Sequence, residues 1–162
     1  MDDRLIARHK VFMDLAIRFA DLSCCLSRKV GAVLVKDWHV LSTAYNGAPS
    51  GFKHCSDIGC RRKGAAPGTR LNECYAVHTE INILTDLAKR CISPEGGTLY
   101  ITTYTCNWCA KAMISAGIKT IIYLNDYPDD FAKELLNTAK IEVIKYSDLI
   151  GGLNEPDLNS GK

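Results

Sequence analysis

Helical and extended patterns of apolar residues alternate along this chain. Apolar residues at every third or fourth position predict helices, and short continuous apolar runs predict strands. The predicted helices are residues 8–26, 79–91, 107–117 and 129–139. The predicted strands are residues 30–35, 40–45, 98–103, 118–124 and 141–144. This mixture places the chain in the α/β class.

The order of these elements predicts the topology of the sheet. The first two strands are separated only by a short turn, which favours an antiparallel hairpin. From residue 98 onward strands alternate with helices, which favours parallel strands with covering helices. We therefore expect a mixed sheet of about five strands, with an antiparallel N-terminal hairpin and helices on both faces. Residues 1–150 are expected to form one domain, and residues 151–162 a flexible tail.

The segment 46–73 has no periodicity and interrupts this pattern. It contains glycines, prolines and more basic than acidic residues. Structureless loops longer than about 15 residues are uncommon in compact domains unless they are functional or disordered. The loop contains Cys55 and Cys60, and Cys74 follows it. We therefore expect an interaction that fixes the loop.

Composition narrows the possible functions. The chain has 162 residues, and its formal net charge of +2 is too small for a dedicated nucleic-acid-binding domain. No apolar stretch has the length of a membrane span, and the acidic N-terminus is not typical of a secretory signal. We expect a cytoplasmic protein. In that compartment the 8 cysteines are expected to be reduced thiols and metal ligands rather than disulfides.

Two short motifs predict a metal site. Cys106 and Cys109 form a C-x-x-C at a predicted helix start, and by itself this pattern also fits a redox pair or two buried thiols. His78 and Glu80 flank Thr79 at another helix start, where a surface His and a helix-capping Glu are the ordinary alternative. Together, one His and two Cys supply three zinc ligands and leave the fourth position open, as in catalytic sites. Glu80 is then placed to move protons beside that position.

H-x-E followed by C-x-x-C resembles the zinc nucleobase deaminases. The sequence departs from their commonest pattern at Thr79, where Ala is usual, and at Thr105, where Pro is usual. Residues 44–51 (AYNGAPSG) are similar to the GYNGxPxG motif of the deoxycytidylate (dCMP) deaminase family, with Ala44 in place of Gly. The segments 27–33 and 117–123 also resemble that family, and the resemblance extends over residues 8–146. It implies a three-layer α/β/α cytidine-deaminase-like fold.

The resemblance implies hydrolysis of dCMP to dUMP and ammonia, a step toward dTTP precursors. A hydroxide held by zinc on His78, Cys106 and Cys109 would attack C4 of the base. Glu80 would take the water proton, deliver it to N3 and then pass a proton to the departing amine. Asn46 resembles the residue that binds the deoxyribose hydroxyl. Tyr123 resembles the aromatic residue that packs on the cytosine ring, although it also fits an ordinary buried tyrosine at a strand end.

The resemblance also implies charged and regulatory contacts. Arg28, Lys29 and Lys53 flank the matched motifs and are candidates for the 5′-phosphate, although flanking basic residues are usually just solvated. Many family members are hexamers that dCTP activates and dTTP inhibits, and Mg²⁺ can accompany such a triphosphate. The residues implied for that second nucleotide site are Asn46, Gly47, Pro49 and Gly51. The basic loop suits a triphosphate, or is simply a solvated surface.

Some family members hold a second, structural zinc near the long loop. The cysteines that match this second site are Cys25, Cys55, Cys60 and Cys74. Four thiolates would close the zinc tetrahedron and fix the loop. The alternative is four free thiols in a loop that nucleotide or a neighbouring subunit orders. Cys24 and Cys91 are expected to be unliganded.

Two other classes of function remain open from the sequence. One is a deaminase for a different base, such as free cytidine, adenosine in tRNA, or a pterin or flavin precursor. The other is a zinc-stabilised binding module without catalysis. Glu80 argues against the module, because a purely structural zinc site has no use for a proton shuttle.

Overall fold

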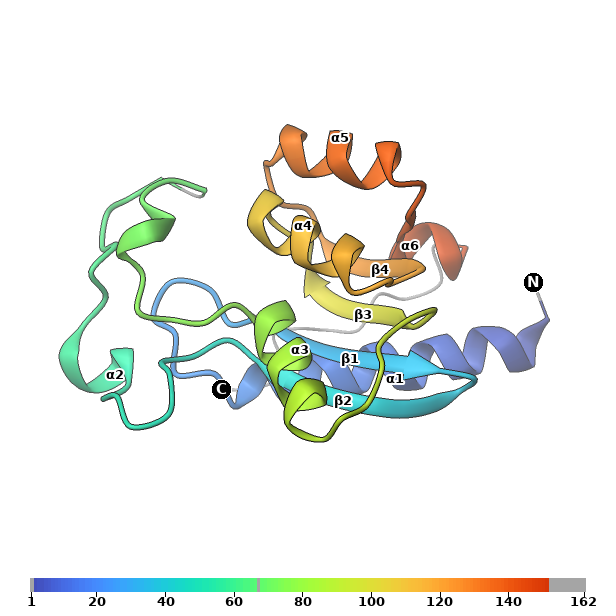
Figure 1. Ribbon diagram of the computed structural model, residues 1–162, viewed down its shortest axis with the longest axis horizontal. Coiled ribbons are helices and arrows are strands. Elements are labelled where there is room, and N and C mark those ends of the chain that lie inside the picture. The colour runs from blue at the N-terminus through green and yellow to red at the C-terminus, as the bar shows by residue number, and fades with distance from the viewer. Residues whose placement is uncertain (1, 67, 152–162) are drawn as a thin grey trace.

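A computed structural model describes residues 2–66 and 68–151 of the protein (Figure 1). The helices are α1 (Asp3–Asp21), α2 (Cys55–Ile58), α3 (Thr79–Lys89), α4 (Asn107–Ser115), α5 (Asp130–Thr138) and α6 (Tyr146–Leu149), with a 3₁₀ turn, η1, at Leu71–Glu73. The strands are β1 (Gly31–Lys36), β2 (His39–Tyr45), β3 (Thr98–Thr103), β4 (Thr120–Asn125) and β5 (Glu142–Lys145). In the described part of the chain, no helix is long and apolar enough to cross a membrane.

The strands form one five-stranded sheet in the order β2-β1-β3-β4-β5. β1 pairs antiparallel with both β2 and β3, whereas β3, β4 and β5 run parallel. This arrangement confirms the predicted mixed sheet, with the hairpin at one edge and the strand–helix alternation producing the parallel half. The carboxyl end of β3 therefore leads directly into the α4 turn, where the C-x-x-C lies.

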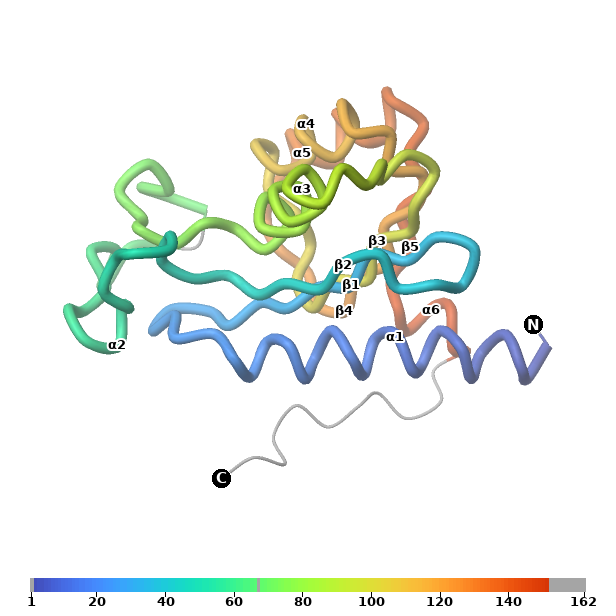
Figure 2. The backbone as a smooth tube through the Cα atoms, turned by 60° about the horizontal axis from the view of Figure 1, so that its bottom comes forward, coloured from blue at the N-terminus to red at the C-terminus, as the bar shows by residue number. Residues whose placement is uncertain are grey.

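Alternating side chains of the strands build two separate cores. On β1, Ala32 and Leu34 pack with α3, α4 and α5, whereas Val33 and Val35 pack with α1 and α6. Successive side chains of a strand point to opposite faces, so a continuous apolar run serves both layers. Figure 2 shows α1 on one side of the sheet and α3, α4 and α5 on the other. The predicted three-layer fold is confirmed.

Gly31, the first residue of β1, lets this strand approach α1 closely. A Cβ on Gly31 would lie 2.1 Å from the carbonyl oxygen of Ala16 and 2.3 Å from the nitrogen of Ala20. Its N–H also donates to Thr102 Oγ1 at 3.1 Å. Only glycine fits this contact without displacing backbone.

Helix α1 differs from the predicted range 8–26 at both ends. It begins at Asp3 because the side chain of Asp2 caps it by accepting from the Arg4 N–H. It ends at Asp21, and Ser23 just beyond it turns its hydroxyl to Asn46. The prediction also missed α6 and the short elements within 46–73. The expected tail lies outside the described residues except for Gly151.

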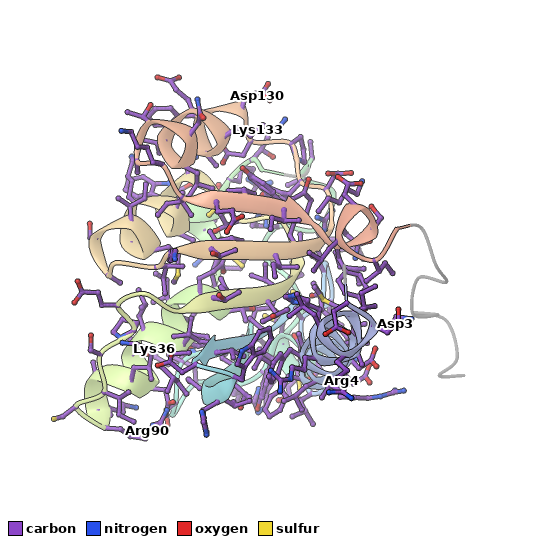
Figure 3. The ribbon with its side chains drawn as sticks, turned by 90° about the vertical axis from the view of Figure 1, so that its right-hand side faces the viewer. Asp3, Arg4, Lys36, Arg90, Asp130 and Lys133 are labelled. Atoms are coloured by element: carbon purple, nitrogen blue, oxygen red, sulfur yellow. The ribbon has the colours of Figure 1, made fainter. Side chains whose placement is uncertain are left out.

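Ion pairs lie on two of the helices that cover the sheet. On α5, Lys133 and Asp130 form an ion pair at 2.8 Å, on the side away from the sheet (Figure 3). Asp86 of α3 pairs with Arg90, the residue that caps this helix, at 2.6 Å, and it also accepts from the Ser42 hydroxyl of β2 at 2.6 Å. The first pair leaves the apolar stripe of α5 free to cover the sheet, and the hydrogen bond from Ser42 connects α3 to β2.

Candidate active site

Two helix N-termini bring the predicted metal ligands together. His78 is the N-cap of α3, Cys106 is the N-cap of α4, and Cys109 lies in the first turn of α4. The ligand atoms of these three residues all lie within 4.8 Å of one another. Two helix dipoles thus direct their positive ends at this point, which favours the anionic form of the thiols.

The distances in this cluster suit zinc. Nδ1 of His78 lies 3.4 Å from the Sγ atoms of both Cys106 and Cys109. Tetrahedral zinc with Zn–S of about 2.3 Å and Zn–N of about 2.0–2.1 Å requires N···S separations of about 3.6 Å. The three donors therefore need only a small adjustment to hold the ion, and a fourth position remains for another ligand.

Contacts among the candidate ligands shift the pKa values of Cys106 and His78. The hydrogen bond from Cys109, assisted by the one with His78, lowers the pKa of Cys106 to about 4 despite burial. The hydrogen bond with Cys106 raises the pKa of His78, and burial opposes it. One thiolate is therefore formed before any metal arrives, and thiolate is the form that binds zinc.

Glu80 lies beside these ligands and is 4% exposed. Burial raises the pKa of its carboxyl group, while the hydrogen bond from Thr105 partly opposes this effect. Thr105 donates from Oγ1 to Glu80 Oε1 at 2.5 Å. A raised pKa makes a carboxylate a better proton acceptor, which suits a group that takes up and delivers protons.

A cavity of about 210 Å³ opens over this cluster. Its floor includes His78, Glu80 and Cys106, at the N-termini of α3 and α4. Its walls come from the segment 25–30, from the end of β3 and from the loop 46–76. In Figure 1 this loop, with α2, extends beyond the edge of the sheet. The long loop without periodicity thus supplies a large part of the lining of this cavity.

Arg28 and Arg62 place two guanidinium groups in the wall of the cavity. The Arg28 guanidinium lies 5.3 Å from the ring centre of Tyr127, another lining residue. Nε of Arg62 donates to the carbonyl of Thr69 at 2.9 Å, which leaves other guanidinium N–H groups available. An anionic group of a ligand could therefore form ion pairs and hydrogen bonds with the guanidinium groups of Arg28 and Arg62.

Comparison with known proteins identifies the family. The family described as "Cytidine and deoxycytidylate deaminase zinc-binding region" matches residues 6–125. The chain belongs to this family. A deoxycytidylate deaminase from Mycobacterium phage D29 is 38% identical over 117 residues, which cover 69% of this chain and 90% of the relative. A deoxycytidylate deaminase from Schizosaccharomyces pombe is 33% identical over 138 residues, 83% of this chain. The chain spans only 42% of that yeast relative's length.

A solved structure agrees with this assignment. The dCMP deaminase of cyanophage S-TIM5, crystallised with dCMP and dUMP, superposes with a TM-score of 0.74 at 31% identity. The match covers 90% of this chain and 98% of the phage chain. The fold predicted from the deaminase resemblance is therefore the fold of a close structural relative.

Asn46 of this family member lines the cavity but is also tied to the protein. Its Oδ1 accepts from the Ser23 hydroxyl at 2.8 Å and from the Val30 N–H at 2.9 Å. Its Nδ2 donates to the Arg28 carbonyl at 2.9 Å. The side chain thus fixes the segment 23–30 against the site, and one Nδ2 hydrogen remains for another acceptor.

Tyr123 is not among the residues that line this cavity, but it lines a neighbouring hollow together with Tyr104 and Tyr127. Its ring packs edge-to-face on Tyr104 at 4.8 Å between centroids. Tyr104 and Tyr127 are the tyrosines that line the cavity. Sequence reasoning missed both of them, as well as Arg62 as an individual residue. Their positions next to the end of β3 and the end of β4 were the available signal.

Lys29 and Lys53 are exposed, and neither belongs to the set of residues that lines the cavity. The structure therefore does not bring these two phosphate candidates into the cavity lining.

Main-chain hydrogen bonds connect the turn that contains the implied second nucleotide motif to the segment before His78. Gly47 and Val77 exchange two main-chain hydrogen bonds, at 3.2 and 2.8 Å, one residue before His78. Gly51, with φ of +87°, lies exposed at the end of the turn.

The four cysteines predicted for a second zinc all line the same cavity: Cys25, Cys55, Cys60 and Cys74. Burial and the neighbouring thiols raise the pKa of Cys55. Within residues 2–66 and 68–151, however, the His78 cluster is the one group of potential ligands that meets the 4.8 Å spacing. The four thiols are thus neighbours, but they are not drawn together as closely as the His78 cluster.

Proposed function

We propose that this protein hydrolyses dCMP to dUMP and ammonia. The observation that supports this most directly is the buried Glu80 beside the His78, Cys106 and Cys109 cluster, at the floor of a cavity with two arginines in its wall. The named relatives and the structural neighbour with dCMP and dUMP support the same substrate. The chain matches less than half of the yeast relatives, so the activity is proposed for this chain on its own residues.

In this proposal His78, Cys106 and Cys109 hold the metal, and Glu80 moves the protons. Zinc, when bound, acts as a Lewis acid that lowers the pKa of a ligated water to near neutrality. Glu80 accepts a proton from the attacking water and delivers it to N3, which makes C4 more electrophilic. It then takes the second proton from the hydroxyl group added at C4 and donates it to the 4-amino group, so that the C4–N bond breaks and ammonia leaves. The single carboxylate must reach all three positions from its buried place.

The nucleotide end of the substrate would lie toward Arg28 and Arg62. Both line the cavity, and guanidinium groups bind phosphate through paired hydrogen bonds. We assign the free Nδ2 hydrogen of Asn46 to the deoxyribose hydroxyl. Tyr127, which stacks with Arg28, and Tyr104 are better placed than Tyr123 to contact the base, because they line the cavity.

The Glu80→Gln variant tests the reaction. It keeps the size of the side chain and its acceptor for Thr105, but it loses the proton-accepting carboxylate. We expect zinc content and fold to be unchanged and ammonia release from dCMP to fall by at least about 100-fold, the usual range for a lost general acid–base. Glu95→Gln, at an exposed position, is the matched control. Turnover of Glu80→Gln at the wild-type rate would refute the mechanism.

Substrate choice is tested by comparing kcat/KM for dCMP, deoxycytidine, cytidine and CMP. We expect dCMP to be preferred because of the two arginines. Preference for a nucleoside would favour deamination of a different base or nucleoside. No deamination of any pyrimidine, with zinc bound and required for folding, would favour the non-catalytic module.

A second zinc on Cys25, Cys55, Cys60 and Cys74 is part of the proposal. These thiols border one cavity, and a metal would draw them into a tetrahedron and fix the loop 46–76. Metal analysis of the purified protein distinguishes the alternatives. Two zinc ions per chain, falling to one in Cys55→Ser and Cys60→Ser, support the second site. One ion in the wild-type chain would refute it.

We also propose regulation by dCTP and dTTP, with Mg²⁺ on the triphosphate, in an assembly of the size of a hexamer. The loop with Asn46, Gly47, Pro49 and Gly51 supports this, because Gly47 is hydrogen-bonded to Val77, the residue just before the metal ligand His78. The exposed aromatic rings of Trp108, at 68% exposure, and Phe131 supply apolar surface for subunit contacts. Initial rates at low dCMP with each triphosphate, and light scattering, test both parts. The cytoplasmic location stays a prediction.

A further inference from the structure

Thr105 forms a contact that the usual sequence pattern of this superfamily does not provide. It lies in the turn between β3 and α4, is 1% exposed, and precedes the zinc ligand Cys106. Its hydroxyl donates to Glu80 Oε1 at 2.5 Å, a distance typical of a short hydrogen bond to a carboxylate. The residue at this place in the superfamily signature is Pro, which has no such donor.

We propose that Thr105 is a positioning residue that fixes the orientation of the Glu80 carboxylate for proton transfer. This inference rests on the proposed function of Glu80 as the proton carrier. The Thr105 hydroxyl holds one carboxylate oxygen, so that the other oxygen is directed for the reaction. The side chain of a glutamate has three rotatable bonds, and one strong hydrogen bond at its end removes most of that freedom.

The surroundings of Glu80 support this role. The Thr105 hydroxyl donates to Oε1 of a carboxylate that is almost fully buried. Glu80 also contacts the thiol of Cys109, so the carboxylate lies beside the second sulfur of the metal cluster. Thr105 and Glu80 thus link the starts of α3 and α4, the same two helices that present the metal ligands.

The position of a proton carrier matters strongly for rate. Misplacing a catalytic group by about 1 Å can cost about 100-fold, and removing a partner that orients a metal-site group typically costs 10–100-fold. A purely structural hydrogen bond would instead affect the stability of the fold and leave kcat unchanged. These two outcomes can be measured separately.

The experiment compares variants of the zinc-loaded protein. We expect Thr105→Val and Thr105→Ala to lower kcat for dCMP by about 10–100-fold with KM changed less than about threefold. Thr105→Ser, which restores the hydroxyl, should return to within about threefold of wild type. Thr120→Val is the matched control: its hydroxyl donates to Glu142 Oε2 at 3.0 Å, on β4 and β5. The control should leave kcat unchanged.

A crystal structure of zinc-loaded Thr105→Ala gives a readout that does not depend on turnover. We expect the three metal ligands unmoved and the Glu80 carboxylate displaced or disordered. An unmoved carboxylate, or wild-type kcat with full zinc content, would overturn the inference. If Thr105→Ser were as slow as Thr105→Ala, the hydroxyl would not be the cause. The wild-type protein could fail to turn over dCMP while the Glu80 carboxylate is still displaced in the Thr105→Ala structure. That combination would refute only the proposed substrate, and not the role of Thr105.

Discussion

Arg62 offers a sharp test of how the cavity distinguishes a nucleotide from a nucleoside. Its guanidinium lines the cavity, and only Nε is bonded to Thr69, so the remaining N–H groups can bind a phosphate. Hydrogen bonds to charged groups contribute about 1.5–3 kcal/mol, which corresponds to roughly 10–150-fold in kcat/KM. We therefore expect Arg62→Ala to lose about that factor for dCMP and to change little with deoxycytidine, which has no phosphate.

The assay measures kcat/KM for both substrates with wild type, Arg62→Ala and Lys63→Ala. Lys63 is the matched control, because it is the next residue, carries the same charge and is exposed outside the cavity lining. Its replacement should lower neither value more than about twofold, since exposed charges act weakly through solvent. Equal losses with both substrates would show that Arg62 acts on loop structure through Thr69. No loss with dCMP would refute its contact with phosphate.

Three further results are expected. Gly31→Ala should lower the free energy of unfolding by about 1–3 kcal/mol, because its Cβ would collide with the backbone of α1. Urea denaturation measures this change, and unchanged stability would contradict the close packing of β1 on α1. Zinc affinity, measured by chelator competition, should fall as pH falls, by up to about 100-fold per pH unit. The reason is that the pKa values of His78 and Cys109 are raised, so that zinc must displace a proton from each group when it binds. A pH-independent affinity would contradict this. Met113→Ala, at a fully buried site of α4, should cost about 2–5 kcal/mol in the same denaturation assay, and a loss below 1 kcal/mol would show that the core repacks.

Strong local patterns allowed most elements to be predicted from sequence. The strand predicted over 98–103 has the same bounds as β3, because β-branched and apolar residues fill both faces of a central strand. The first helix was misplaced because its apolar stripe is weak near the N-terminus, and a cap at Asp2 sets its start. The short helix α6 was missed because a single turn has too few residues to show a period.

The sequence by itself determined the chemistry of the site. His78, Glu80, Cys106 and Cys109 were identified from their types and spacing, because a metal needs particular donor atoms at helix starts and those atoms are visible in the chain. Tertiary structure decided which other side chains share that cavity. Arg62 and Tyr127 come from distant segments that a fold must bring together, and the Thr105 contact with Glu80 joins two different helix starts. Such contacts depend on the packing of α3 and α4 on one sheet, which no local pattern encodes.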